Sequence, residues 1–378
     1  MSEAASGTTA LEQVQRHFAR FAQGHAHLRL YHAICRGLAD DPDAASLLLA
    51  AQPGQARPVL LLAALHDLVL RRPELPAARW YSSVVGRDAV ATGDPWPEVR
   101  ATILDHADEL RRTIATHRTQ TNEVNRAVYV AAAVSLAARD LPDTPVVLVE
   151  LGASAGLLLG VDRYRVELRR QGVALVVGDP DSAVTCHGED RSPTALASLA
   201  LPPVAARVGL DVAPVDTADA DAIRWLEACI WPDVPGRIER FRAAMILLRT
   251  DPPRLQRGDM VEDLEGAVEA TLQDLTSTEG RDLHLVVFSS WALTYAERAR
   301  RGFVAEVLAR CARAVPAVSW VTAEPAGCVP GLPLPEGLPV DDDTTLLGAR
   351  RWRGGRELAA EAWGTCHPHG EWLAVTGP

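Results

Sequence analysis

The chain has 378 residues, 49 acidic and 38 basic side chains, and a formal net charge of −11. An acidic protein of this kind is poorly suited to bind nucleic-acid phosphates broadly. All basic side chains are arginine, and the lack of lysine excludes lysine Schiff bases and the phosphate-binding loop that ends in Lys-Ser or Lys-Thr.

The first part of the chain carries helical patterns, and we expect residues 1–140 to form an all-α N-terminal domain. Apolar residues recur at helical spacing, and the third pattern is apolar almost all round, which predicts a central helix. The expected helices cover residues 11–21, 27–38, 58–71 and 98–139. No strand-like alternation precedes residue 145.

Both asparagines of the chain, Asn122 and Asn125, lie just before the first expected strand. We infer that a chain otherwise free of asparagine keeps it where a specific amide is needed. If this segment is helical, Asn122 and Arg126 share a face, where the guanidinium can bind a carboxylate. We expect Gln120, Asn122 and Arg126 to contact the amino-acid end of a cofactor or the substrate; the alternative is a buried polar network that ties the helices to the sheet.

After residue 140 the pattern changes to short apolar runs that alternate with helical stretches, so residues 141–378 are expected to form a second domain. The candidate strands cover residues 145–150, 174–177, 207–212, 254–258, 284–288 and 318–323. The helical stretches cover residues 157–170, 222–231, 235–248, 260–275 and 295–315. This alternation predicts an α/β fold with a parallel, doubly wound sheet. Strands at 344–352, 356–363 and 371–376, separated by glycine turns, predict an antiparallel meander that closes the sheet edge.

A glycine turn, Glu150-Leu-Gly-Ala-Ser-Ala-Gly156, ends the first strand. Glycines let the backbone come close to a ligand, and the N-terminus of the helix expected next favours negative charge. This order of strand, acid, glycine turn and helix resembles the first motif of class I S-adenosylmethionine methyltransferases. The resemblance implies a Rossmann-like methyltransferase-type sheet with S-adenosylmethionine as its cofactor, held by Glu150, Gly152, Ser154 and Gly156.

Two further acids follow expected strands. Asp211 lies at the end of 207–212, and in this fold such an acid binds the ribose hydroxyls, because a carboxylate can accept from both. Asp259 follows 254–258 and resembles the acid that receives the adenine amino group. A solvated loop acid or a helix N-cap is the alternative for each of them.

The same turn has the Gly-x-Ser-x-Gly spacing of the nucleophile elbow of α/β hydrolases. Ser154 would then be the nucleophile, and an acid at 341–343 with His367 or His369 would complete the chain order. The helical patterns before the turn disfavour this hypothesis, as does the lack of an upstream His-Gly-Gly segment for an oxyanion hole. Two more hypotheses are a turn that only packs strand against helix and a non-catalytic ligand-binding protein.

Residues after the fifth expected strand are candidates for the substrate side of the site, because methyltransferases of this fold place substrate and catalytic groups there. Ser290 and Tyr295 are the candidate catalytic residues. Trp291, in the same segment, is a candidate substrate contact. Trp231 and Arg237 belong to a separate cluster earlier in the chain and are further candidates, since aromatic rings beside arginines hold flat or anionic molecules. Tryptophans in the apolar core are the alternative.

The scattered cysteines, without any Cys-x-x-Cys, are expected to be reduced thiols, and no metal site is expected. The first ten residues lack the pattern of a signal peptide, and the longest apolar run is too short to span a membrane. These features predict a cytoplasmic protein without membrane or nucleic-acid partners.

As a whole, the sequence resembles a bacterial family of unknown function with a methyltransferase-like core. The shared segments are residues 118–123, 150–157, 162–164, 207–214, 225–226, 231–232, 258–259 and 369–370. The resemblance implies no substrate. We therefore expect an S-adenosylmethionine-dependent methyltransferase that acts on a small molecule.

Overall fold

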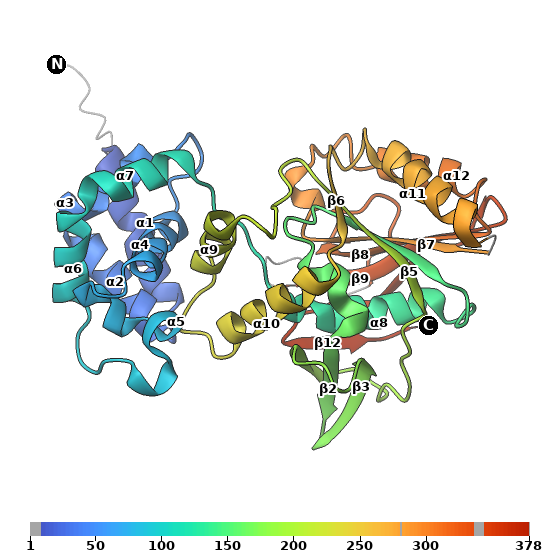
Figure 1. The fold of residues 1–378 in the computed structure, drawn as a ribbon, viewed down its shortest axis with the longest axis horizontal. Coiled ribbons are helices and arrows are strands. Elements are labelled where there is room, and N and C mark those ends of the chain that lie inside the picture. Colours follow the sequence, from blue (N-terminus) through green and yellow to red (C-terminus); the bar gives the residue numbers. More distant parts are fainter. Residues whose placement is uncertain (1–8, 280–281, 336–343, 378) are drawn as a thin grey trace, which may run out of the picture. The chain divides into compact units, whose positions relative to one another are not determined.

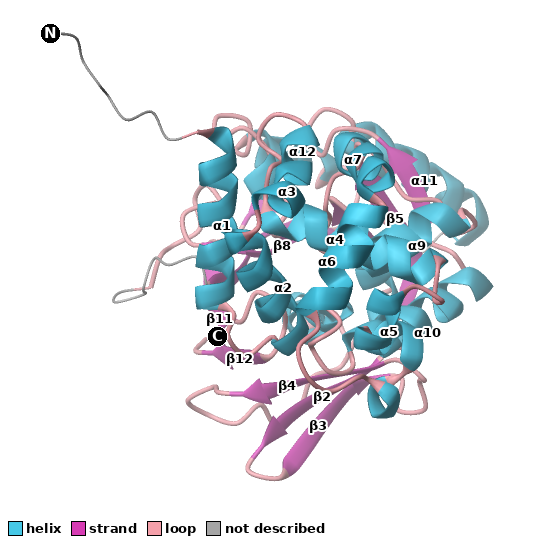
Figure 2. Cartoon of the chain, turned by 90° about the vertical axis from the view of Figure 1, so that its left-hand side faces the viewer, coloured by secondary structure: helices cyan, strands magenta, loops and turns pink. Residues whose placement is uncertain are grey.

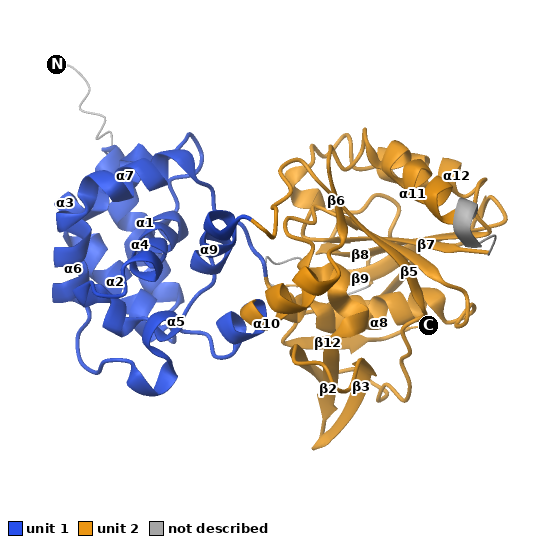
Figure 3. Cartoon of the chain, viewed as in Figure 1, with its two compact units in different colours: residues 1–122, 219–241 blue, residues 123–218, 242–378 orange. Residues whose placement is uncertain are grey.

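The computed structural model describes residues 9–279, 282–335 and 344–377. It divides into two compact units (Figure 3), each built from two chain segments. Unit 1 contains residues 1–122 and 219–241, and unit 2 contains residues 123–218 and 242–378. This division differs from the expected boundary at residue 140, because residues 123–140 belong to unit 2 and residues 219–241 belong to unit 1.

Unit 1 is helical. Its helices are α1 (Ala10–Gly24), α2 (Arg29–Asp40), α3 (Pro42–Ala45), α4 (Pro58–Arg71), α5 (Ser82–Val85), α6 (Trp96–Asp105), α7 (Ala107–Thr116) and α9 (Ala220–Ala228), with 3-10 turns η1 (Ser46–Ala50), η2 (Pro76–Trp80) and η3 (Arg87–Ala89). Thr9 and Glu12 form a capping box at the start of α1. Most of α4 is buried, as expected for a helix that is apolar almost all round. The first three predicted helices are thus confirmed.

The fourth expected helix, 98–139, is wrong as a continuous element. It is divided into α6, α7, an extended segment, the 3-10 turn η4 (Val124–Arg126) and α8 (Ala127–Ala138). Threonine and asparagine in this segment favour turns over helix. In addition, the carbonyl of Arg118 accepts the indole N–H of Trp225 at 2.9 Å instead of a helical amide. Asn122 and Arg126 therefore do not share a helical face.

Unit 2 contains one mixed sheet (Figure 1), and the α/β prediction is confirmed. Its strands are β1 (Val146–Leu151), β2 (Arg165–Arg170), β3 (Val173–Gly178), β4 (Thr185–Asp190), β5 (Val204–Asp211), β6 (Arg254–Arg257), β7 (His284–Ser290), β8 (Ala317–Pro325), β9 (Thr345–Arg353), β10 (Arg356–Glu357), β11 (Glu361–Cys366) and β12 (Trp372–Val375). The order across the sheet is β3-β2-β4-β12-β11-β9-β8-β7-β1-β5-β6, and β10 pairs with β9.

The strands β6, β5, β1, β7 and β8 are neighbours and run parallel. Every residue of β1 is buried, as in a strand covered on both faces. The helix α11 (Leu264–Glu279) contacts β5, and α12 (Phe303–Cys311) contacts β8. The helix α8 contacts β7 and β8. Consecutive strands on either side of β1 are therefore covered by helices, as the alternation of elements predicted.

The tail forms the expected antiparallel strands, since β9 pairs with β8, β11 with β9, and β12 with β11. It does not close the sheet edge, however. β12 pairs with β4 in parallel, and β4 continues to β2 and β3. The meander thus lies inside the sheet, and its far side carries the β2–β3 hairpin that projects at the bottom of Figure 2.

The helical stretch expected at 157–170 is wrong. The chain forms a 3-10 turn, η5 (Leu157–Arg163), and then β2. The residues of β2 alternate polar and apolar, and the pair Gln171-Gly172 has positive φ angles of 49° and 83°. Two consecutive residues of this kind form the tight turn of a β-hairpin, which pairs β2 with β3. In the described part of the chain, no helix is long and apolar enough to cross a membrane.

Candidate functional site

The glycine turn lies at the carboxyl end of β1, between the ends of β5 and β7. Its backbone is held to β5: the N–H of Gly152 donates to the carbonyl of Leu210 at 2.8 Å. Gly152, Ser154 and Gly156 have φ angles of 72°, 51° and 72°. Positive φ is free of steric penalty in glycine but strained in serine, so the turn places strain on Ser154.

Asp211 organises this turn from the end of β5. Its Oδ2 accepts the N–H of Ser154, and its Oδ1 accepts the N–H of Ala213, both at 2.8 Å. A carboxylate has about four acceptor positions, so these two bonds leave capacity for further donors. The sequence predicted Asp211 as a ribose ligand; the structure adds that its carboxylate joins the loops after β1 and β5.

The loop after β7 covers the glycine turn. A Cβ at Gly152 would lie 2.8 Å from the Cβ of Ala292, so these two loops touch at Gly152. Trp291 has a φ of 57°, and its indole N–H donates to the Thr345 hydroxyl at 2.8 Å. Of the three non-glycine residues with positive φ among those described, Ser154 and Trp291 belong to these two loops. Backbone strain of this kind is common at functional sites.

Glu150, the last-but-one residue of β1, is a buried acid. Its side chain is only 5% exposed, and its Oε2 has no hydrogen-bond partner among the described residues. Burial raises the pKa of Glu150 well above its usual value, the charge of Asp211 acts in the same direction, and the Arg126 guanidinium acts against both. An unpaired buried carboxyl group lowers the stability of the folded protein, and the Oε2 atoms of both Glu150 and Glu324 are of this kind.

Arg126 and Tyr129 connect η4 and α8 to the end of β7. Arg126 donates to the carbonyl of Ser290 at 3.2 Å and to that of Pro368 at 3.0 Å. The hydroxyl groups of Tyr129 and Ser290 lie 2.7 Å apart. The predicted Arg126 and Ser290 are therefore brought together in unit 2, and Arg126 acts electrostatically on Glu150.

Glu324, near the end of β8, was missed by the sequence analysis. Its Oε1 accepts the N–H groups of Ala292 and Leu293 at 3.0 and 3.2 Å, so it holds the loop that covers Gly152. Burial raises the pKa of Glu324 to about 7, against the lowering effect of these two hydrogen bonds. An acid at the carboxyl end of an apolar strand was the available signal, the same that identified Glu150.

Asp259 has the role of a turn and ion-pair residue. Its Oδ1 accepts the N–H groups of Val261 and Glu262 at 2.8 and 3.1 Å, and Arg300 donates to the same oxygen at 3.0 Å. Burial alone would raise the pKa of Asp259, but these amide and guanidinium donors hold it below its usual value. These bonds belong to the turn at residues 260–262, because α11 begins only at Leu264, so Asp259 is a loop acid and not a helix N-cap.

Four predicted residues belong to unit 1 and not to unit 2: Gln120, Asn122, Trp231 and Arg237. Trp231 packs with the rings of Phe21, His25 and Tyr31, as expected for a core tryptophan. Tyr295 is in unit 2, in η6 (Leu293–Tyr295), and its side chain is 83% exposed.

The second asparagine, Asn125, forms a buried polar network, the alternative to a ligand contact for this segment. Its Nδ2 donates to the carbonyls of His187 and Gly370, and its Oδ1 accepts the N–H of His187, all at 3.0 Å. These bonds join η4 to β4 and to the turn between β11 and β12. Asn125 is thus a structural residue of unit 2.

The hydrolase hypothesis is only partly covered by the structure. The acids at 341–343 lie outside the described residues, and His367 and His369 lie in the turn between β11 and β12. In the described part of the chain β1 is the first strand, and the turn after it leads into a 3-10 turn. A nucleophile elbow follows a strand and begins a helix. No cluster of three or more His, Cys, Asp or Glu side chains suited to a metal occurs among the described residues.

Comparison with known proteins identifies one family. The family described as "Uncharacterized protein conserved in bacteria (DUF2332)" matches residues 15–374, nearly the whole chain. No curated protein and no solved structure matches.

Proposed function

The chain belongs to this uncharacterised bacterial family, and we propose that it binds S-adenosylmethionine at the carboxyl ends of β5, β1 and β7 and transfers the methyl group to a small molecule. The observation that carries the proposal is the unpaired, buried Oε2 of Glu150 beside the strained glycine turn. A buried carboxylate without a partner is suited to an ammonium group, such as that of an amino-acid moiety.

The order of the strands supports the proposal. Along β6-β5-β1-β7-β8 the chain moves outward from β1 in both directions, so that β1 and β7 form a topological switch point. Open α/β sheets bind ligands in the crevice at this point, outside the carboxyl ends of the strands. A Rossmann-like, methyltransferase-type sheet is accordingly the fold that we propose for unit 2.

Each of three acids in unit 2 would bind a different part of the cofactor. Glu150 would bind the ammonium group. Asp211 already accepts the N–H groups of Ser154 and Ala213, and its remaining acceptor positions would bind the ribose hydroxyls. Asp259 is the candidate for the adenine amino group. The bound cofactor supplies a methyl group that its sulfonium already activates, so positioning carries most of the catalysis.

The loop after β7 would form the substrate side of the site. Tyr129 and Arg126 bind Ser290, the last residue of β7, from which the loop starts at Trp291. Glu324 accepts the N–H of Ala292 within the loop. Because Ala292 touches Gly152, movement of this loop would open the glycine turn. Tyr295, exposed beyond it, is free to contact an acceptor molecule.

Titration calorimetry with S-adenosylhomocysteine tests the proposal. We expect micromolar binding that Glu150→Gln and Asp211→Ala each weaken at least tenfold, while Glu306→Gln, an exposed acid on α12, leaves it unchanged. Affinity should also rise with pH in the unsubstituted protein, since the raised pKa of Glu150 keeps the carboxyl protonated at low pH. Equal affinity in Glu150→Gln would contradict the assignment of Glu150.

Absence of binding at millimolar concentration would contradict the proposal as a whole. The second candidate, a serine hydrolase, is favoured by one observation, the positive φ of Ser154. Labelling of the protein by a fluorophosphonate, and loss of the label in Ser154→Ala, would establish that candidate.

A further inference from the structure

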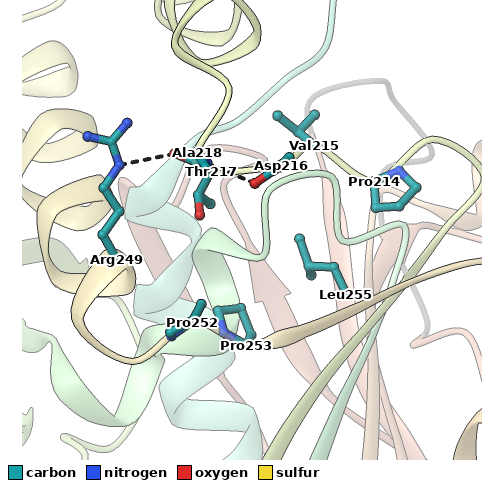
Figure 4. Close-up of a pocket in the computed structure, with 9 residues that line it drawn as sticks. All are labelled: Pro214, Val215, Asp216, Thr217, Ala218, Arg249, Pro252, Pro253 and Leu255. Carbon is teal, nitrogen blue, oxygen red and sulfur yellow. Dashed lines mark hydrogen bonds between the residues drawn. The ribbon is translucent and has the colours of Figure 1, made fainter.

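A cavity of about 570 Å³ lies in unit 2, beside the glycine turn, and neither Glu150 nor Glu324 lines it (Figure 4). Three segments form it: the loop after β5, the end of α10 (Arg237–Thr250), and the residues that enter β6. Its size is within the range of small-molecule sites, about 300–1,000 Å³. None of the predicted cofactor residues lines it.

Most of the wall is apolar and rigid. Pro214, Val215, Pro252, Pro253 and Leu255 form it, and three of these five are prolines. A proline ring has a fixed φ and little conformational freedom to lose when a ligand binds. The wall therefore offers a preformed surface for an apolar group.

Two charged side chains, Arg249 and Asp216, also line the cavity, together with Thr217 and Ala218. Both bind the same peptide unit: Arg249 Nε donates to the carbonyl of Thr217 at 3.0 Å, and Asp216 Oδ1 accepts the N–H of Ala218 at 2.8 Å. Among the described residues, no other partner occurs for the Arg249 guanidinium or for Asp216 Oδ2. One cationic and one anionic group thus remain available.

The shared peptide unit fixes the spacing of these charges. Its carbonyl and N–H point in opposite directions, so Arg249 Nε and Asp216 Oδ1 lie at most about 8 Å apart. An α-amino acid spans a distance of this order when its carboxylate binds a guanidinium and its ammonium binds a carboxylate. Figure 4 draws Arg249 at the left of the view, Pro214 at the right, and Pro252, Pro253 and Leu255 between them, so the side chain of a bound amino acid would have apolar groups beside it.

We propose that this cavity binds a free α-amino acid with an apolar side chain. Its carboxylate pairs with Arg249, its ammonium with Asp216, and its side chain packs on the prolines and Leu255. The cavity also borders the glycine turn, because Val215 donates to the carbonyl of Ser154 at 3.0 Å and a Cβ at Gly156 would lie 2.8 Å from Pro253. The proposal does not depend on the cofactor or on methyl transfer.

Fluorine NMR titration of the full chain with three matched probes tests each charge separately. The probes are 4-fluoro-L-phenylalanine, 3-(4-fluorophenyl)propanoate without the ammonium, and 2-(4-fluorophenyl)ethylamine without the carboxylate. We expect the amino acid to bind at least tenfold more tightly than either other probe. Equal affinity of the three probes would overturn the proposal.

Variants assign the two charges. Arg249→Gln should weaken the amino acid and the propanoate about tenfold and leave the amine unchanged, whereas Asp216→Asn should weaken the amino acid and the amine and leave the propanoate unchanged. Arg254→Gln, an exposed arginine paired with Asp274 outside the cavity, is the matched control. Both charged sites are exposed, so the fold should tolerate the changes. A variant that weakens all three probes alike would contradict the assignment.

Competition separates this cavity from the proposed cofactor site. 4-Fluoro-L-phenylalanine should bind equally well in the presence of S-adenosylhomocysteine. Displacement of the probe would show that the cavity holds the amino-acid end of the cofactor and would overturn a separate site. If S-adenosylhomocysteine does not bind at all, the probe titrations still decide the proposal.

Discussion

At the scale of single residues, two buried acids distinguish the strand-end edge of unit 2. Glu150 and Glu324 each have one buried oxygen without a hydrogen-bond partner among the described residues, and Glu324 uses its other oxygen to hold the loop that covers Gly152. Both have a pKa raised by burial. A carboxyl group whose pKa is raised in the folded protein makes the free energy of unfolding depend on pH, and this free energy falls as the pH rises.

The pH dependence of Glu324 can be measured. Its pKa is about 7 in the folded protein against an ordinary value of 4.5, so its contribution to stability is complete below about pH 4.5 and is lost as the pH rises toward 7. Glu324→Gln does not titrate, and its stability relative to the unsubstituted protein should rise by about 1–3 kcal/mol over this window.

Urea unfolding between pH 4.5 and 8 provides this measurement. Glu306→Gln, on the exposed side of α12, should show a constant difference from the unsubstituted protein. A constant difference for Glu324→Gln as well would contradict the raised pKa.

At the scale of elements, two loops lie in contact at the carboxyl ends of β1 and β7. The loop after β1 and the loop after β7 meet at Gly152 and Ala292, and each also contains a non-glycine residue with positive φ. Neither loop is held by a long α-helix, since η5 and η6 are 3-10 turns. Instead, the carboxylates of Asp211 and Glu324 hold the loops by accepting hydrogen bonds from their backbone N–H groups.

Gly152→Ala tests this loop contact. The positive φ should cost about 1–2 kcal/mol, and displacement of Ala292 should add to this loss of unfolding free energy. Gly54→Ala is the control, because Gly54 has a similar φ of 77° and no atom near its Cβ position. Gly152→Ala should lose more unfolding free energy than Gly54→Ala, as measured by urea unfolding. The double change Gly152→Ala and Ala292→Gly should recover this additional loss. Strict additivity of the two changes would show that the loops do not touch.

At the scale of the whole molecule, each unit is assembled from chain segments that are distant in sequence. Residues 219–241 complete unit 1, where Trp225 and Ala228 join the core formed by the first 122 residues. Asp233 from this segment accepts the N–H groups of Leu30 and Tyr31 at 2.8 and 3.0 Å. It therefore caps α2, whose own N-cap, Leu28, has no capping side chain.

Asp233→Ala should weaken unit 1 selectively. Two amide groups at the start of α2 would lose their acceptor, at an expected cost of about 1–3 kcal/mol. Hydrogen–deuterium exchange of the full chain should become faster in α2 and remain unchanged in β1 and β7, while Asp88→Ala, an exposed acid of unit 1, should change neither. Equal loss of protection in β1 and β7 would contradict separate stabilisation of the two units.

Local sequence patterns alone determined much of this protein. Buried parallel strands are nearly continuous apolar runs, so β1, β7, β8 and the end of β5 could be predicted. The helices α1 and α2 could be predicted from their 3.6-residue period, and α4 from its almost entirely apolar sequence. The glycine turn and the acids Glu150 and Asp211 were found for the same reason, because they end such runs. These features depend on neighbours in the sequence.

The tertiary structure decided what depends on distant partners. β2 and β4 are strands because they pair with each other and with β3 and β12, and 117–123 is extended partly because Trp225 binds its backbone. Glu324 became part of the site only where β8 meets the loop after β7. The cavity with Arg249 and Asp216 likewise requires three segments to meet. Long-range pairing and packing, which override local propensity, are the physical reason that the sequence could not show them.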